Sequence, residues 1–204
     1  MRININIIKI FLLALFSFLA SHVMTDSISD EKKYSVLGKR DAPNILIEYA
    51  SLSCVHCANF HNERLPAIKS ELIDTGKLKY IYKDFPLDLP AMLASMASNC
   101  YTGVQYFEIL NSLFRNQKKW VTSSNNKKQL NISFHSILKE HGVTLDKINS
   151  CTGESADNKK RWDIILATRL DGQKKGVSST PTFFLNGKKL EGLVDLKKIK
   201  QHIY

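Results

Sequence analysis

The chain has 204 residues, 44% of them hydrophobic, which is enough for one domain of moderate size or one domain that carries an insertion. Its formal net charge of +10 would suit a nucleic-acid partner. The lysines, however, are scattered in pairs such as Lys118-Lys119 and Lys159-Lys160, which are typical of solvated faces, so we expect no nucleic-acid binding.

The N-terminus has the order of a signal peptide. Two basic residues, Arg2 and Lys9, precede an apolar run over 10–19, and two small residues follow. The run is shorter than the roughly 20 residues that a membrane-spanning helix needs. We therefore predict a signal peptide over 1–21, with a retained N-terminal anchor as the alternative because Leu19 is large for a cleavage site.

A predicted strand and a predicted helix flank a pair of cysteines. Residues 44–50, "NILIEYA", are rich in β-formers and predict a buried strand that holds one acid, Glu48. Apolar residues at helical spacing from Phe60 onwards predict a helix. Between them lies "SCVHCANFH". Cys54 would then start the helix, where free N–H groups and the macrodipole favour an anion such as a thiolate.

The remaining elements follow in order. Residues 78–83 predict a second strand, 182–190 a hairpin around Asn186-Gly187 with Pro181 at its start, and 195–203 a closing helix. Between the second strand and the hairpin, apolar residues at spacings near three and four predict helices with these core positions: Met92, Met96, Val104, Phe107, Leu110, Leu113, Phe114, Phe134, Ile137, Leu138, Trp162, Ile165, Leu166 and Leu170.

This order of elements resembles the thioredoxin fold with an inserted helical domain, an α/β architecture, and more closely the DsbA family of periplasmic thiol:disulfide oxidoreductases. Three stretches carry the resemblance: "IEYASLSCVHCANFH", with Glu48 six positions before Cys54, "YKDFPLD" and "GVSSTPTFFLNGKKLEG". The expected organisation is a signal peptide (1–21), a first thioredoxin part (22–89), an inserted helical domain (90–175) and a second thioredoxin part (176–204).

The resemblance implies an exported enzyme of the periplasm in which Pro181 is cis and faces the cysteine pair. It also implies reduced, unfolded exported proteins as substrates and a quinone-linked membrane oxidase of the DsbB type as the reoxidising partner. We expect no cofactor and no metal.

Cys54 and Cys57 allow three interpretations. A zinc site would need a histidine, His56 or His61, and one of the two remaining cysteines, but no second closely spaced ligand pair exists. A structural staple would close a very small loop and stabilise little. Redox exchange is therefore the favoured interpretation.

In the redox interpretation, Cys54 is the exposed nucleophile and Cys57 the buried resolving thiol. The helix start and His56 should lower the pKa of Cys54 strongly. Stabilising the reduced form makes the disulfide a strong oxidant of other thiols. A substrate thiolate attacks Cys54, a second substrate thiol displaces Cys54, and the enzyme leaves reduced.

Other ionisable residues are less decisive. Glu48 is either a satisfied buried acid or a proton relay for Cys57. Lys83 is expected as an exposed charge that could pair with Glu48 or Asp84. His61, like three later histidines, is assigned to the surface or to a helix.

The other two cysteines, Cys100 and Cys151, both fall within the predicted helical insertion. The four cysteines form an even set, and an oxidising compartment permits disulfides. We predict a structural disulfide between Cys100 and Cys151.

Two positions differ from the best-known DsbA pattern. Val55-His56 stands in place of Pro-His, and Thr180 instead of Val precedes Pro181. Thr at this position also occurs in isomerases and reductases of the superfamily, which usually carry an N-terminal dimerisation domain that 22–33 is too short to supply. We predict a monomeric oxidase. The alternatives are a disulfide isomerase or reductase, and a non-catalytic chaperone or binding module.

Overall fold

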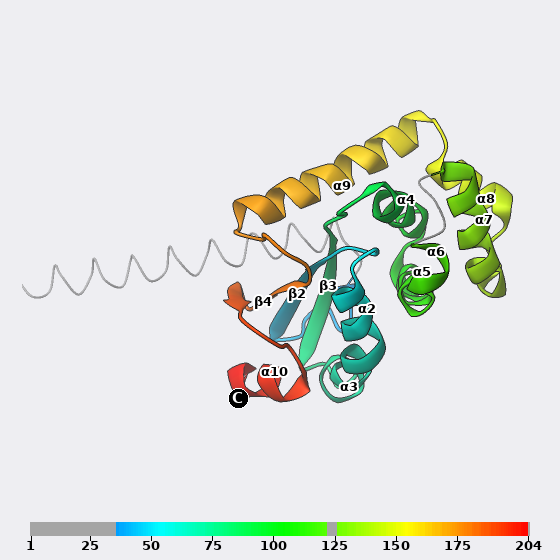
Figure 1. Ribbon diagram of the computed structural model, residues 1–204. Helices are drawn as coiled ribbons and strands as arrows, with labels where there is room; N and C mark the ends of the chain where they lie inside the picture. Colours follow the sequence, from blue (N-terminus) through cyan, green and yellow to red (C-terminus); the bar gives the residue numbers. More distant parts are fainter. Residues whose placement is uncertain (1–35, 122–125, 204) are drawn as a thin grey trace, which may run out of the picture. The chain divides into compact units, whose positions relative to one another are not determined.

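The computed structural model describes residues 36–121 and 126–203 (Figure 1). The predicted signal peptide, 1–21, lies outside the described residues. Within the two described ranges, no helix is long and apolar enough to cross a membrane.

A five-stranded mixed sheet forms the centre of the fold, which confirms the predicted α/β class with a thioredoxin-like arrangement. The strand order is β1-β3-β2-β4-β5, and only the β2–β3 pair is parallel. The strands are β1 (Val36–Leu37), β2 (Asn44–Ala50), β3 (Leu78–Asp84), β4 (Thr182–Leu185) and β5 (Lys188–Leu190). The parallel pair needs a crossover, and the helical segment after the cysteine pair supplies it.

That crossover helix is not regular. It consists of α2 (Val55–Asn59), a π-helical turn (Phe60–Arg64), α3 (Leu65–Ile68) and a second π-helical turn (Lys69–Ile73). A π turn shifts the side chains that follow it away from the 3.6-residue period. Phe60 and His61, the first two residues of the first π-helical turn, are both buried, so His61 is a helix residue, as one of its two assignments had it, and not a surface residue.

The described part of the insertion is helical, and the predicted boundaries 90–175 stay a prediction. Its elements are α4 (Leu89–Ser98), α5 (Gly103–Arg115), α6 (Gln117–Trp120), α7 (Lys127–Leu138), a 3-10 turn (Lys139–His141), α8 (Leu145–Thr152) and α9 (Ala156–Lys174), and α10 (Leu196–Ile203) closes the described chain. Most predicted core positions are buried. Val104, Leu166 and Leu170 are exposed, because the helical spacing does not show which face of each helix is covered.

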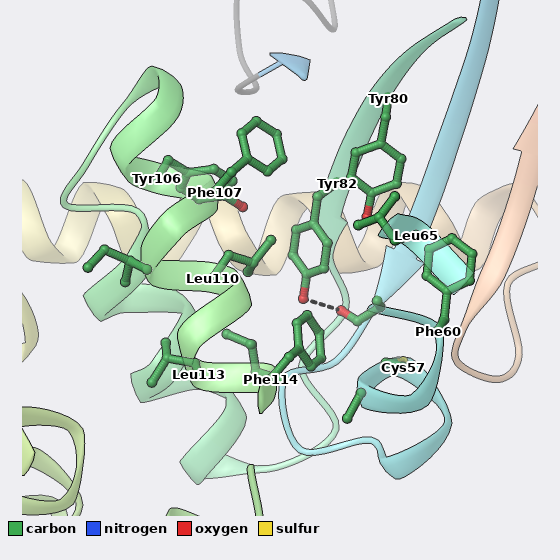
Figure 2. Packing of buried hydrophobic residues seen from close by; sticks show 14 of the residues in the cluster. Cys57, Phe60, Leu65, Tyr80, Tyr82, Tyr106, Phe107, Leu110, Leu113 and Phe114 are labelled. Atoms are coloured by element: carbon green, nitrogen blue, oxygen red, sulfur yellow. Dashed lines mark hydrogen bonds between the residues drawn. The ribbon is translucent and has the colours of Figure 1, made fainter. Parts of the chain in front are cut away.

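One hydrophobic cluster joins the sheet to the insertion (Figure 2). Phe107, Leu110 and Phe114 on α5 face Tyr82 on β3 and the helix that carries Cys57. The Tyr82 hydroxyl donates to the backbone carbonyl of Ala50, 3.2 Å away. The helical insertion therefore shares its core with the strand that leads to the cysteine pair.

The other face of the sheet contacts α9. The Tyr49 hydroxyl donates to Asp171 Oδ2 at 2.8 Å, and the ammonium group of Lys83 lies 3.7 Å from the same oxygen. Lys83 is only 1% exposed, so its assignment as an exposed charge is wrong. Residue 83 is opposite Tyr49 in the register of β2 and β3, and successive side chains of a strand point to opposite faces, so the Lys83 side chain points to the Tyr49 face of the sheet and away from Glu48 and Asp84.

We expect Gly172→Ala to lower the free energy of unfolding by about 1–3 kcal/mol, the usual range for overpacking. A Cβ at position 172 would lie 2.8 Å from the ring of the buried Tyr49 and 3.2 Å from that of Phe85. Denaturant titration of Gly172→Ala against Gln173→Ala, an exposed neighbour on the same helix, measures this. An unchanged or higher stability of Gly172→Ala would show that α9 does not pack this closely.

Candidate active site

Cys54 is the residue that precedes the first turn of α2, as the sequence predicts. It is only 8% exposed, so the prediction that Cys54 is an exposed residue is wrong. Its side chain lies against the backbone of Thr180. The Cys54 thiol donates to the Thr180 carbonyl at 3.3 Å, across 126 positions of sequence. This contact joins the two halves of the thioredoxin part at the cysteine pair.

The pKa of Cys54 is lowered from its ordinary value to about 5. The largest cause is the hydrogen bond from the Cys57 thiol; burial opposes it, and Thr180 and the backbone N–H groups of Cys57 and His56 add to the lowering. His56 itself is exposed, and its contribution comes from its backbone. The N–H groups at the start of α2 thus lower the pKa of Cys54 as the sequence predicts, but the Cys57 thiol lowers it most, and the His56 ring is not among the causes.

Cys57 has the opposite character. It is fully buried on α2, and burial raises the pKa of its thiol far above the ordinary value. The hydrogen bond to Cys54 and the negative charge of Glu48 raise the pKa further. Both thiols are free in this structure, so near neutral pH the pair holds one thiolate, on Cys54, and one thiol, on Cys57.

The peptide bond between Thr180 and Pro181 is cis, as the resemblance implies. Pro181 directly precedes β4, so its missing N–H takes no bond from the ladder. The hydroxyl of Thr180 is buried, and the Thr180 side chain contributes to the lowered pKa of Cys54.

Glu48 is completely buried in β2 and belongs to a cluster that the sequence did not predict. Its Oε2 accepts a hydrogen bond from the Tyr80 hydroxyl and lies 3.1 Å from His61 Nε2. Its other oxygen, Oε1, has no hydrogen-bond partner among the described residues. Tyr80 could have been found from the sequence, because alternation places it on the same face of β3 as Tyr82, which is opposite Glu48 in the register.

Cys100 and Cys151 are joined by a disulfide that links the segment after α4 to α8. Two cysteines bonded to each other cannot bind zinc, so the zinc interpretation loses the remaining ligands it required. In the described ranges, no group of three or more histidine, cysteine or acidic side chains is placed to hold a metal ion.

We expect the alkylation rate of Cys54 in the reduced protein to fall with a midpoint near pH 5 as the pH is lowered, because only the thiolate reacts. The same lowered pKa stabilises the reduced fold: the contribution is complete above the ordinary pKa of a thiol and is lost as the pH falls through about 5. Rapid alkylation followed by peptide mapping measures the midpoint. A midpoint near that of free cysteine, or faster labelling of Cys57, would contradict the assignment.

A Cys-X-X-Cys pair at a helix start, with one lowered and one raised pKa and a cis-proline loop against the first sulfur, defines the class of thiol:disulfide exchange proteins. The family model described as Thioredoxin matches residues 30–204. The solved alpha-DsbA1 of Wolbachia pipientis is 33% identical, with a TM-score of 0.71, and the match covers 83% of this chain and 88% of that one. The chain belongs to the DsbA family of thiol:disulfide oxidoreductases.

Two curated relatives agree with this family. Disulfide bond formation protein D of Bacillus subtilis is 25% identical over 190 residues, which cover 87% of this chain and 80% of that protein. A Rickettsia bellii protein named as a protein-disulfide oxidoreductase is 29% identical over 157 residues, which cover 76% of this chain. The chain spans 58% of the length of that relative.

Proposed function

We propose that this protein donates the Cys54–Cys57 disulfide to reduced, unfolded exported proteins in the periplasm. The observation that carries the proposal is the asymmetry of the two thiols. A stabilised Cys54 thiolate favours the reduced enzyme, and a dithiol whose reduced form is favoured has a disulfide that readily oxidises other thiols.

The exchange takes two steps. A substrate thiolate attacks Cys54 Sγ, the Cys54–Cys57 bond breaks, and Cys57 leaves and takes up a proton. A second substrate thiolate then attacks the substrate sulfur of the mixed disulfide. Cys54 leaves as a thiolate, which its lowered pKa makes a good leaving group, and the substrate keeps the new disulfide.

The backbone around the cis-proline supports this exchange. Thr180 lies against Cys54 and Pro181 directly precedes β4, so an extended substrate segment that reaches Cys54 would run along the loop that carries the cis-proline. Glu48, buried near Cys57 and with one free oxygen, is the group we assign to proton transfer at Cys57.

Reoxidation needs a second protein, and we propose a quinone-linked membrane oxidase of the DsbB type. In that reaction Cys54 attacks the partner's disulfide, Cys57 loses its proton and closes the Cys54–Cys57 bond, and the partner leaves reduced. We propose a monomer, because Cys54, Cys57, Thr180 and Pro181 all come from one chain and the site needs no second subunit.

An isomerase is the second candidate. The observation that favours it is the position of Thr180 beside Cys54, because the Thr180 side chain contributes to the pKa of Cys54 and thereby to the balance between oxidised and reduced enzyme. A non-catalytic chaperone is disfavoured by the shifted pKa of Cys54, which binding alone does not require.

The test compares two reactions of one multi-cysteine substrate. Oxidation of the reduced substrate should be much faster than the uncatalysed reaction, and repair of the same substrate with scrambled disulfides should be slower than by a dedicated isomerase. Equilibration of the dithiol with glutathione buffers should give an oxidising potential. Fast repair without catalysed oxidation would contradict the oxidase and support the isomerase. A protein that catalyses neither reaction would support the non-catalytic chaperone.

A further inference from the structure

The cluster beside Cys57 contains two side chains that the exchange described above does not use, His61 and Tyr80. Glu48 on β2, His61 on the π turn and Tyr80 on β3 meet around one atom, Glu48 Oε2. The Tyr80 hydroxyl also lies 3.3 Å from His61 Nε2. All three side chains are buried, with 0% exposure for Glu48 and Tyr80 and 5% for His61.

The imidazole of His61 is held in one orientation. It stacks on the Phe114 ring at 4.0 Å between centroids with a 23° angle between planes, and it meets the edges of Tyr80, Tyr82 and Phe60. Its Nδ1 lies 3.2 Å from Asn111 Oδ1 on α5, a partly exposed residue. The ring therefore bridges a fully buried carboxyl group and a side chain that reaches the solvent.

The two ring nitrogens face acceptors on both sides. Nδ1 points at an amide oxygen and Nε2 at a carboxylate oxygen. A proton on Nδ1 can be donated to Asn111 Oδ1. A hydrogen bond between Nε2 and Glu48 Oε2 then needs a second proton, which these two atoms share. The Tyr80 hydroxyl donates to the same oxygen, which leaves Oε1 as the free oxygen of Glu48.

We propose that His61 is a positioning residue for the exchange reaction: it holds a proton on the Glu48 carboxyl group, and Glu48 passes that proton to Cys57 when Cys57 leaves the active-site disulfide. This inference rests on the proposed function and deepens it.

The step balances without another reactant. The substrate thiolate forms a bond to Cys54 Sγ, the Cys54–Cys57 bond breaks, and its electron pair goes to Cys57 Sγ. Cys57 takes the proton from Glu48, and the Glu48 carboxylate that remains accepts hydrogen bonds from His61 and Tyr80. In reoxidation the same proton returns from Cys57 to Glu48.

The position of Cys57 explains why a proton source is needed there. A sulfur that is fully buried is a poor leaving group as a thiolate, because its charge would be desolvated. The other groups around His61 do not supply the proton: burial raises the pKa of Tyr80 and Tyr82, and Asn111 and Phe114 on α5 do not titrate.

The test measures only the first step. Oxidised protein is mixed with a peptide that holds one cysteine, and formation of the mixed disulfide is followed by acid quenching and mass spectrometry over a range of pH. Because the peptide's ionisation is the same in every reaction, the ratio of wild-type to variant rates isolates the protein's contribution. The matched control is His141→Gln, a partly buried histidine 3.1 Å from Ser112 Oγ on another element.

We expect His61→Gln to be slower by about tenfold to a hundredfold at low pH, within the range of general acid catalysis, and the ratio of the two rates should shrink as the pH rises, because general acid catalysis contributes less at low proton activity. The rate should fall more in deuterated water for the wild type than for His61→Gln. Glu48→Gln and the double variant Glu48→Gln/His61→Gln should react at similar rates, because the pair acts as one unit. In His61→Gln the pH midpoint of Cys54 alkylation should equal that of the wild type. The control His141→Gln should form the mixed disulfide at the wild-type rate at every pH.

A wild-type protein that forms no mixed disulfide contradicts the proposed function. A wild-type protein that reacts normally, together with a ratio near one at every pH, overturns the role of His61 and leaves the proposed function intact. A lower but pH-independent rate shows a structural role only and also overturns the inference. If His61→Gln does not fold, Asn111→Ala and Tyr80→Phe replace it, and unchanged pH profiles in both overturn the inference.

Discussion

Replacing Cys54 with serine is expected to reduce thiol oxidation to the uncatalysed rate, whereas replacing Cys57 with serine is expected to trap a mixed disulfide. Cys54 holds the lowered pKa and borders the Thr180 loop, so without it no thiolate faces a substrate. In Cys57→Ser the Cys54 thiolate still attacks a disulfide, but no second thiol releases the adduct. Incubation of both variants with oxidised glutathione, followed by intact-protein mass spectrometry, gives the answer.

The expected pattern is one glutathione adduct on Cys57→Ser, located at Cys54, and none on Cys54→Ser. The doubly substituted Cys54→Ser/Cys57→Ser protein is the blank, since Cys100 and Cys151 are already bonded to each other. An adduct at Cys57 in the Cys54→Ser protein would reverse the roles of nucleophile and resolving thiol. It would also mean that the burial of Cys57 does not protect it.

Removing the Cys100–Cys151 disulfide is expected to lower the free energy of unfolding by up to about 4 kcal/mol, from the chain entropy of a loop of this length. The bond closes a separation of 51 residues, which encloses α5, α6 and α7 together with their connections. Cys100→Ala/Cys151→Ala should therefore unfold at lower denaturant concentration. Urea titration by circular dichroism provides the measurement.

The stability measurements belong in the Cys54→Ser/Cys57→Ser background, so that no other thiol exchanges with the bond. With Cys54 and Cys57 retained, Cys100→Ala/Cys151→Ala should keep most of its oxidation activity, because the disulfide lies in the helical insertion and not at the cysteine pair. A stability equal to that of the parent would show that other contacts of α4 and α8 hold the loop closed without the bond.

The chemistry of the site was largely predictable from local sequence. Cys54 precedes the first turn of a helix and Cys57 lies in it, so two local causes lower the pKa of Cys54: the hydrogen bond from the Cys57 thiol and the N–H groups of that turn. The position of Pro181 before the Asn186-Gly187 hairpin was predictable for the same reason, because proline and the turn residues restrict the conformation of their own backbone. These features depend on a few neighbouring residues, and their physics does not change with the rest of the fold.

The surroundings of the site depended on tertiary contacts. The π-helical turn that contains His61 cannot be recognised from the spacing of apolar residues. His61 contacts Glu48 and Tyr80 because the fold places their three elements together. Lys83 is charged and still 1% exposed, because α9 covers that face of the sheet with Asp171. By itself, the sequence determined which thiol has the lowered pKa and where its helix and proline lie. Only the tertiary structure decided which buried groups surround Glu48, because burial and pairing come from elements that are distant in the chain.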